Sequence, residues 1–121
     1  MRYVRLYADA QGESHFEEVE VHFQTVDYAP PAPPLELSAF QPASNTFFMQ
    51  LPAGWAGDWH PSPQRQLFVV VSGGFEMQAS DGEIRRFFPG DVNLGEDTHG
   101  KGHRSKALGD GGCVLALVHL A

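Results

Sequence analysis

Hydrophobic and polar residues alternate along much of the chain with a period of two. In residues 16–26, Val19, Val21 and Phe23 share one face, while the residues between them are polar. This period is typical of a β-strand with one buried face. The same reading predicts further strands at residues 2–7, 46–51, 66–72, 74–79, 84–88, 92–94, 102–108 and 113–120.

Two stretches depart from simple alternation. Residues 66–72 are apolar on both faces, which predicts a strand that is buried on both sides. Residues 29–43 contain five prolines, and proline cannot donate a hydrogen bond to a sheet. We therefore expect an extended arm there, which could lie over the domain or reach a second subunit.

Turn residues separate the predicted strands, and no stretch has a sustained helical period. The 13 glycines and 9 prolines are many for 121 residues, and residues 80–83 (SDGE) are typical of a hairpin turn. An all-β fold of short antiparallel strands follows, either a sandwich or a small barrel.

Composition limits the classes of partner. A length of 121 residues fits one domain, and a net charge of −7 with only 8 Lys and Arg argues against nucleic acid or an anionic membrane surface. No apolar run has the length of a membrane helix, and no signal peptide is recognisable. The single cysteine, Cys113, fits a buried strand residue better than a nucleophile, and a cytoplasmic location is expected.

Candidate chemistry lies in two segments bounded by glycines. Between Gly54 and Gly73 the first contains His60, Ser62 and Gln66 at the spacing of metal ligands. The second segment covers residues 90–107 and includes Gly90, Asp91, Gly100 and His103.

These spacings resemble the two motifs of the cupins, which are small antiparallel jelly-roll β-barrels. The first cupin motif reads G-x5-H-x-H-x3-E-x6-G and is matched in spacing at about 54–73. The second reads roughly G-D-x4-P-x-G-x2-H-x3-N and is matched at about 90–107, with about two extra residues before the second glycine. On this resemblance, residues 1–121 are identified as a single cupin domain with a jelly-roll barrel.

The resemblance implies a metal site that has lost part of its ligand set. Metal-binding cupins hold a divalent transition metal with three histidines and a glutamate. His60 and His103 keep two of these ligands, whereas Ser62 replaces a histidine and Gln66 replaces the glutamate. Because a divalent cation is held best when a carboxylate offsets its charge, we expect iron, zinc, nickel or manganese to be held weakly or not at all. His99 is a further candidate ligand.

Three functions remain open at this point. The favoured one is a small-molecule pocket in the barrel, with His60, Gln66, His103 and Trp59 as ligand-binding residues and no assigned catalytic residue. The second is a metal-dependent oxygenase, isomerase or lyase that acts on a small organic substrate. The third is a non-catalytic structural or regulatory protein. In each case the resemblance implies a homodimer, to which the proline-rich arm at 29–43 could contribute.

Overall fold

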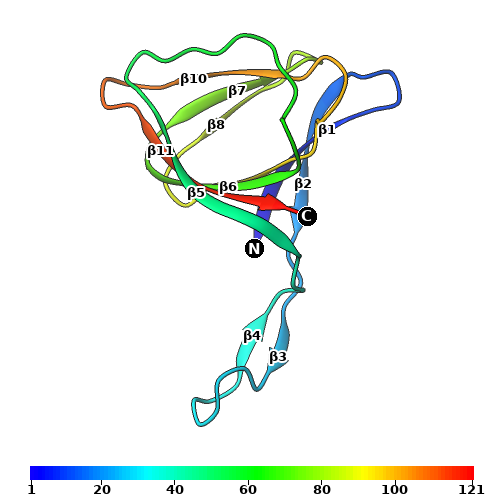
Figure 1. Ribbon diagram of the computed structural model, residues 1–121, viewed down its shortest axis with the longest axis vertical. Helices are drawn as coiled ribbons and strands as arrows, with labels where there is room; N and C mark the ends of the chain where they lie inside the picture. Colours follow the sequence, from blue (N-terminus) through cyan, green and yellow to red (C-terminus); the bar gives the residue numbers. More distant parts are fainter.

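The computed structural model describes residues 1–121 as eleven β-strands in three sheets. A six-stranded sheet has the order β2-β1-β9-β6-β11-β5, a three-stranded sheet has the order β10-β7-β8, and β3 and β4 form a separate hairpin (Figure 1). No helix has the length and apolar character that crossing a membrane requires. The strands are β1 (Arg2–Ala8), β2 (Ser14–Glu20), β3 (Gln24–Val26), β4 (Leu35–Leu37), β5 (Ala43–Leu51), β6 (Gln66–Gly73), β7 (Phe75–Ala79), β8 (Ile84–Phe87), β9 (Val92–Gly95), β10 (His103–Ala107) and β11 (Cys113–Leu120).

The core lies between the six-stranded and three-stranded sheets. Phe68 of β6 meets Phe75 of β7 edge to face, with ring centroids 5.3 Å apart, and Phe75 stacks on Phe87 of β8 at 5.0 Å. All three rings are buried. Cys113 is also buried, and burial raises the pKa of its thiol, as suits a strand residue of the core.

The predicted closed, all-antiparallel barrel is wrong in two respects. The two main sheets face each other without joining into one hydrogen-bonded cylinder. In addition, β1 pairs with β9 in parallel, with Val4 opposite Asn93, while every other strand pairing is antiparallel. Alternation along a strand indicates which side chains face the core, but it carries no information about the direction of the neighbouring strand.

The predicted strand at 16–26 is divided between the body and an arm. β2 stops at Glu20, which stands opposite Arg2 of β1, and the pairing extends beyond these residues through a hydrogen bond from the Val21 N–H to the Met1 carbonyl oxygen. The chain then leaves the body as the β3–β4 hairpin, called here the arm (residues 22–41), which projects away from the sheets in Figure 1. The proline-rich segment thus forms the turn and the returning half of a hairpin.

A histidine links the turns of the two main sheets. His15 of β2 places Nε2 2.7 Å from Asp9 Oδ2 and Nδ1 2.9 Å from Asp81 Oδ2. Asp9 lies in the β1–β2 turn and Asp81 in the β7–β8 turn. The hydrogen bond to Asp9, followed by that to Asp81, raises the pKa of His15, and the same histidine lowers the pKa of Asp9.

This link predicts a pH-dependent contribution to stability. Because the folded pKa of His15 lies above its ordinary value of 6.5, the contribution is complete below that value and disappears as the pH rises through the folded pKa. The lowered pKa of Asp9 gives the opposite pH dependence. The contribution of Asp9 to stability is complete at pH values above its ordinary pKa of 3.8 and disappears as the pH falls through its folded pKa. Urea midpoints of the wild type and of His15→Gln should therefore differ more at about pH 5.5 than at about pH 9. A difference that stays constant with pH would contradict the prediction.

Candidate functional site

The two predicted histidines lie side by side. A short segment before β6 pairs with β10, so that His60 stands directly opposite His103 in an antiparallel bridge. Each backbone N–H donates to the other residue's carbonyl, at 2.9 and 3.0 Å. Residues directly opposite in such a pair project their side chains to the same face. The imidazole centroids are accordingly 4.8 Å apart.

Both rings are oriented by hydrogen bonds at Nδ1. The His60 Nδ1 lies 2.7 Å from the Asp58 carbonyl oxygen, and the His103 Nδ1 lies 2.6 Å from Asp97 Oδ2. A carbonyl oxygen can only accept, so the His60 Nδ1 must carry a proton. In each ring, Nε2 is the nitrogen that remains for a ligand.

Asp97 is a buried carboxylate that the sequence analysis did not select. It has no exposed surface, and its second oxygen accepts a 2.7 Å hydrogen bond from Ser62 Oγ. Ser62 therefore points at Asp97, and it does not act as the ligand that its motif position implies. Together the two side chains form a rigid support behind His103.

The histidines border a cavity of about 500 Å³ between the two sheets. His103 is nearly buried in its wall, whereas His60 is exposed, which places it at the mouth. Gln66 of β6 also lines the cavity. The apolar wall consists of Phe47, Met49, Leu51, Trp55, Phe68, Phe75, Met77, Leu115 and Leu117.

His119 is a further histidine of the cavity that the sequence analysis did not select. Its ring packs edge-on against Phe47, with centroids 4.9 Å apart. The sequence did indicate this placement. His119 follows the core residues Leu115 and Leu117 of β11 at intervals of four and two residues, so its side chain lies on the same face of the strand.

Comparison with solved structures identifies the architecture. No protein-family model matches the chain, and no curated protein matches it either. KdgF from a Halomonas species is 26% identical with a TM-score of 0.51, over 81% of this chain and 88% of that one. The cupin domain of Schizosaccharomyces pombe Cnp3 is 16% identical with a TM-score of 0.53, over 89% of this chain and 72% of that one. The chain has the cupin fold.

The match to a third structure has a similar extent. An RmlC-like cupin from Shewanella frigidimarina is 16% identical with a TM-score of 0.49, over 98% of this chain and 85% of that one. The likeness to the Cnp3 cupin domain confirms, at the level of the fold alone, the resemblance of the two sequence segments to cupin motifs.

The donor set of this cupin-fold chain does not fit a tightly held divalent cation. Nowhere in the structure do three His, Cys, Asp or Glu side chains come together as a metal site. The nearby carboxylate, Asp97, lies behind His103 and accepts hydrogen bonds from His103 and Ser62. Two imidazoles and the neutral amide of Gln66 remain, and none of these groups offsets the charge of a cation.

Two other predicted site residues lie outside the cavity. Trp59 directly precedes His60, so its side chain takes the opposite face, where its ring centroid lies 5.0 Å from Cζ of Arg104. His99 is exposed in the loop between β9 and β10. That loop docks on the β1–β2 turn, where the Lys101 N–H donates to the Gly12 carbonyl oxygen. His99 is not among the residues that line the cavity.

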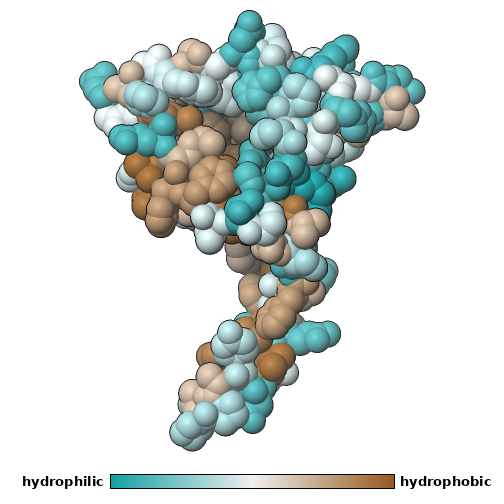
Figure 2. Space-filling model, in the orientation of Figure 1, coloured by the Kyte–Doolittle hydropathy of each residue, from teal (hydrophilic) through white to brown (hydrophobic).

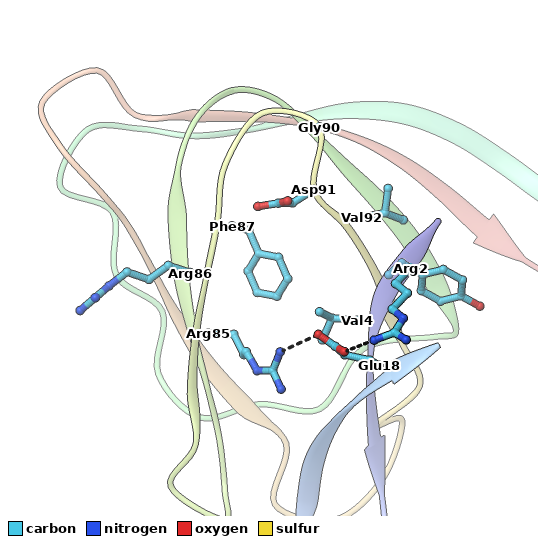
Figure 3. Close-up of a pocket in the computed structure, with 10 residues that line it drawn as sticks. Arg2, Val4, Glu18, Arg85, Arg86, Phe87, Gly90, Asp91 and Val92 are labelled. Carbon is cyan, nitrogen blue, oxygen red and sulfur yellow. Dashed lines mark hydrogen bonds and ion pairs between the residues drawn. The ribbon is translucent and has the colours of Figure 1, made fainter. Parts of the chain in front are cut away.

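Another depression, of about 240 Å³, lies near β1 and β8 (Figure 3). Glu18 lies between Arg85, at 3.8 Å, and Arg2, at 3.4 Å. Arg86 projects away from these groups and pairs with Glu76. Since its arginines are already paired with carboxylates, the depression offers no free charge to a ligand, and we assign it no function.

Proposed function

We propose that this cupin binds a small organic molecule in the cavity, without the need for a resident divalent metal. The molecule has an apolar, ring-sized body and a head group that donates a hydrogen bond, such as the hydroxyl of a phenol or alcohol. The observation that carries the proposal is the orientation of His60 and His103, whose Nδ1 atoms are both engaged within the protein beside an apolar cavity.

The polarity of the head group follows from the histidine tautomers. An imidazole that donates through Nδ1 carries a lone pair on Nε2, and there it accepts a hydrogen bond. The Asp58 carbonyl oxygen imposes this tautomer on His60, and the Asp97 carboxylate supports the same tautomer in His103. Two acceptors thus flank the position of the head group, and Gln66 can supply an amide beside them.

The body of the ligand follows from the walls. Cavities of roughly 300–1,000 Å³ with mostly apolar linings and a few polar groups are typical of small-molecule sites. At about 500 Å³, with four aromatic side chains in its wall, this cavity is suited to one or two fused rings. Asp97 acts as a positioning residue, because it contacts His103 and not the cavity.

Calorimetric titration with two matched probes tests the proposal. 2-Naphthol carries the donor, and 2-methoxynaphthalene has a similar ring system without it. We expect 2-naphthol to bind about 5- to 150-fold more tightly, because the methyl ether leaves a buried acceptor unpaired. EDTA should leave the affinity unchanged.

Two variants locate the contact. His103→Phe should reduce the preference for the hydroxyl, because only the His60 acceptor then remains, whereas His99→Phe, a matched change outside the cavity, should retain it in full. Equal affinity of the wild type for both probes would reject the proposed head-group contact. Loss of binding in EDTA would favour the metal-dependent alternative instead.

A further inference from the structure

The side of the three-stranded sheet that faces away from the core carries a cluster of basic side chains. In one cross-strand row, Lys106 of β10, Glu76 of β7 and Arg86 of β8 stand opposite one another. In the next row, Arg104 of β10 stands opposite Gln78 of β7. Each of these residues alternates with a residue of the core or of the cavity wall, so their side chains project outward. We call this set of five residues the basic patch.

The basic patch has an excess of positive charge, although the chain as a whole has a net charge of −7. Its one carboxylate, Glu76, accepts a hydrogen bond from Arg86 at 3.1 Å and lies 3.5 Å from the Lys106 ammonium through its other oxygen. Arg104 has no carboxylate partner, and its Nε donates to the amide oxygen of Gln78 at 2.8 Å. Three cations therefore share one carboxylate, which leaves two positive charges unbalanced.

A depression of about 460 Å³ lies over this charge. Its lining includes Arg104, Lys106, Glu76 and Gln78 of the basic patch, together with Ile84 of β8, which is 48% exposed. The terminal nitrogens of the Arg104 guanidinium and the Lys106 ammonium thus border a space that is open to solvent. This arrangement offers a ligand two cationic donors beside a small apolar surface.

The Arg104 side chain is held in position from both sides. Its Nε is bound to Gln78, and its Cζ lies 5.0 Å from the ring centroid of Trp59, a cation–π contact. Trp59 and Arg104 each adjoin a histidine of the His60–His103 bridge, whose backbone hydrogen bonds measure 2.9 and 3.0 Å. A guanidinium that is already ordered loses little conformational entropy when it receives a ligand.

The basic patch is separate from the apolar surface of the molecule. Figure 2 shows apolar surface where Figure 1 draws β5 and β11, and more of it along the arm. Those strands belong to the six-stranded sheet, whose residues 66–72 are buried on one face only, because Val71 is 51% exposed, although their pattern predicts burial on both. The basic patch belongs to the other sheet, on the far side of the core.

The basic patch is also separate from the cavity. His60 and His103 face the cavity, whereas their sequence neighbours Trp59 and Arg104 meet on the outer side of the same bridge. None of the five residues of the basic patch lines the cavity. A ligand on the patch is therefore distinct from the ligand proposed for the cavity.

We propose that the basic patch binds a small phosphate monoester, with its phosphate between Arg104 and Lys106 and its organic body against Ile84. The planar guanidinium presents parallel donors that match phosphate oxygens, and the ammonium adds a point charge. A phosphate monoester carries about −1.5 to −2 charges at pH 7, which balances the excess of the patch, whereas a carboxylate or a sulfate ester carries only one. The depression is larger than a phosphate group, which leaves room for the body of the ester.

NMR titration with three probes tests this assignment. Phenyl phosphate is the monoester, phenyl sulfate has the same ring with one charge fewer, and inorganic phosphate lacks the ring. At about pH 8 and about 20 mM salt, where surface charges are little screened, we expect phenyl phosphate to bind at least about 5-fold more tightly than either of the others. The indole signal of Trp59 should move more than that of Trp55, which lines the cavity.

Three charge variants locate the binding site. Arg104→Gln should weaken the binding of phenyl phosphate at least about 5-fold. Arg2→Gln removes the same charge from an exposed arginine that is already paired with Glu18 and Glu20, and it should change the affinity less than about 2-fold. Glu76→Gln removes the carboxylate of the basic patch and should strengthen binding. Circular dichroism should show the same fold for all three variants.

Several results would overturn the proposal. Equal losses in Arg104→Gln and Arg2→Gln would mean that overall charge alone attracts the anion. A Trp55 signal that moves more than that of Trp59 would place phenyl phosphate in the cavity. Phenyl sulfate or inorganic phosphate bound as tightly as phenyl phosphate would contradict the assignment to a monoester, and so would the absence of binding at about 10 mM phenyl phosphate.

Discussion

Replacing Asp97 by alanine should lower the free energy of unfolding by about 3–5 kcal/mol, because it removes the buried partner of two other polar groups. Ser62 Oγ and His103 Nδ1 both donate to this carboxylate, at 2.7 and 2.6 Å. All three side chains are buried, so both donors would lose their acceptor in the interior of the protein. Urea denaturation followed by circular dichroism measures the change.

Two variants separate the role of the carboxylate from general effects near the site. Asp97→Asn keeps the shape and one acceptor oxygen, so we expect a smaller loss than for alanine. Asp58→Ala removes an exposed carboxylate whose Oδ1 accepts only the Trp59 N–H, and its effect should be small. If Asp97→Ala costs no more than Asp58→Ala, the buried network does not contribute as described.

Gly102→Ala should be still more damaging and should prevent the two histidines from pairing. Gly102 has φ of +73°, and an added Cβ would lie 2.2 Å from both the carbonyl carbon and the oxygen of His60. These are backbone atoms, so relief of the clash would require the His60–His103 bridge to open. We expect a loss of more than about 4 kcal/mol, or failure to accumulate as folded protein.

Gly109 offers a matched control for this substitution. Its φ is +68°, and an added Cβ would meet nothing within 4 Å. Gly109→Ala therefore carries the strain of the left-handed conformation alone, about 1–2 kcal/mol. The difference between the two variants, measured as soluble yield and urea midpoint, isolates the close approach to His60. Similar values for both would show that the contact has little energetic weight.

Motif spacing was sufficient to bring His60 and His103 together, although 42 intervening residues separate them in the chain. Spacing reports where a residue stands and not where its side chain points. Ser62 occupies a ligand position, yet it turns to Asp97, a residue outside either motif's ligand set. Trp59 sits beside His60 in the sequence and faces the opposite way.

The sequence by itself determined most strands of the two main sheets and, where polar and apolar residues alternate, the face that meets the core, but it predicted neither the break in the strand at 16–26 nor β4. Side chains alternate across a strand whatever its neighbours are, so the period of two can be read locally. It also determined that two histidines, without a glutamate, stand at the cupin positions.

Only the tertiary structure decided the parallel pairing of β1 with β9, the separation of the arm from β2, and the support of His103 by Asp97. Each of these features depends on which distant segment lies alongside, and therefore on contacts between residues far apart in the chain. Local periodicity contains no record of those contacts, because the same alternating strand can pair in either direction and with several different partners.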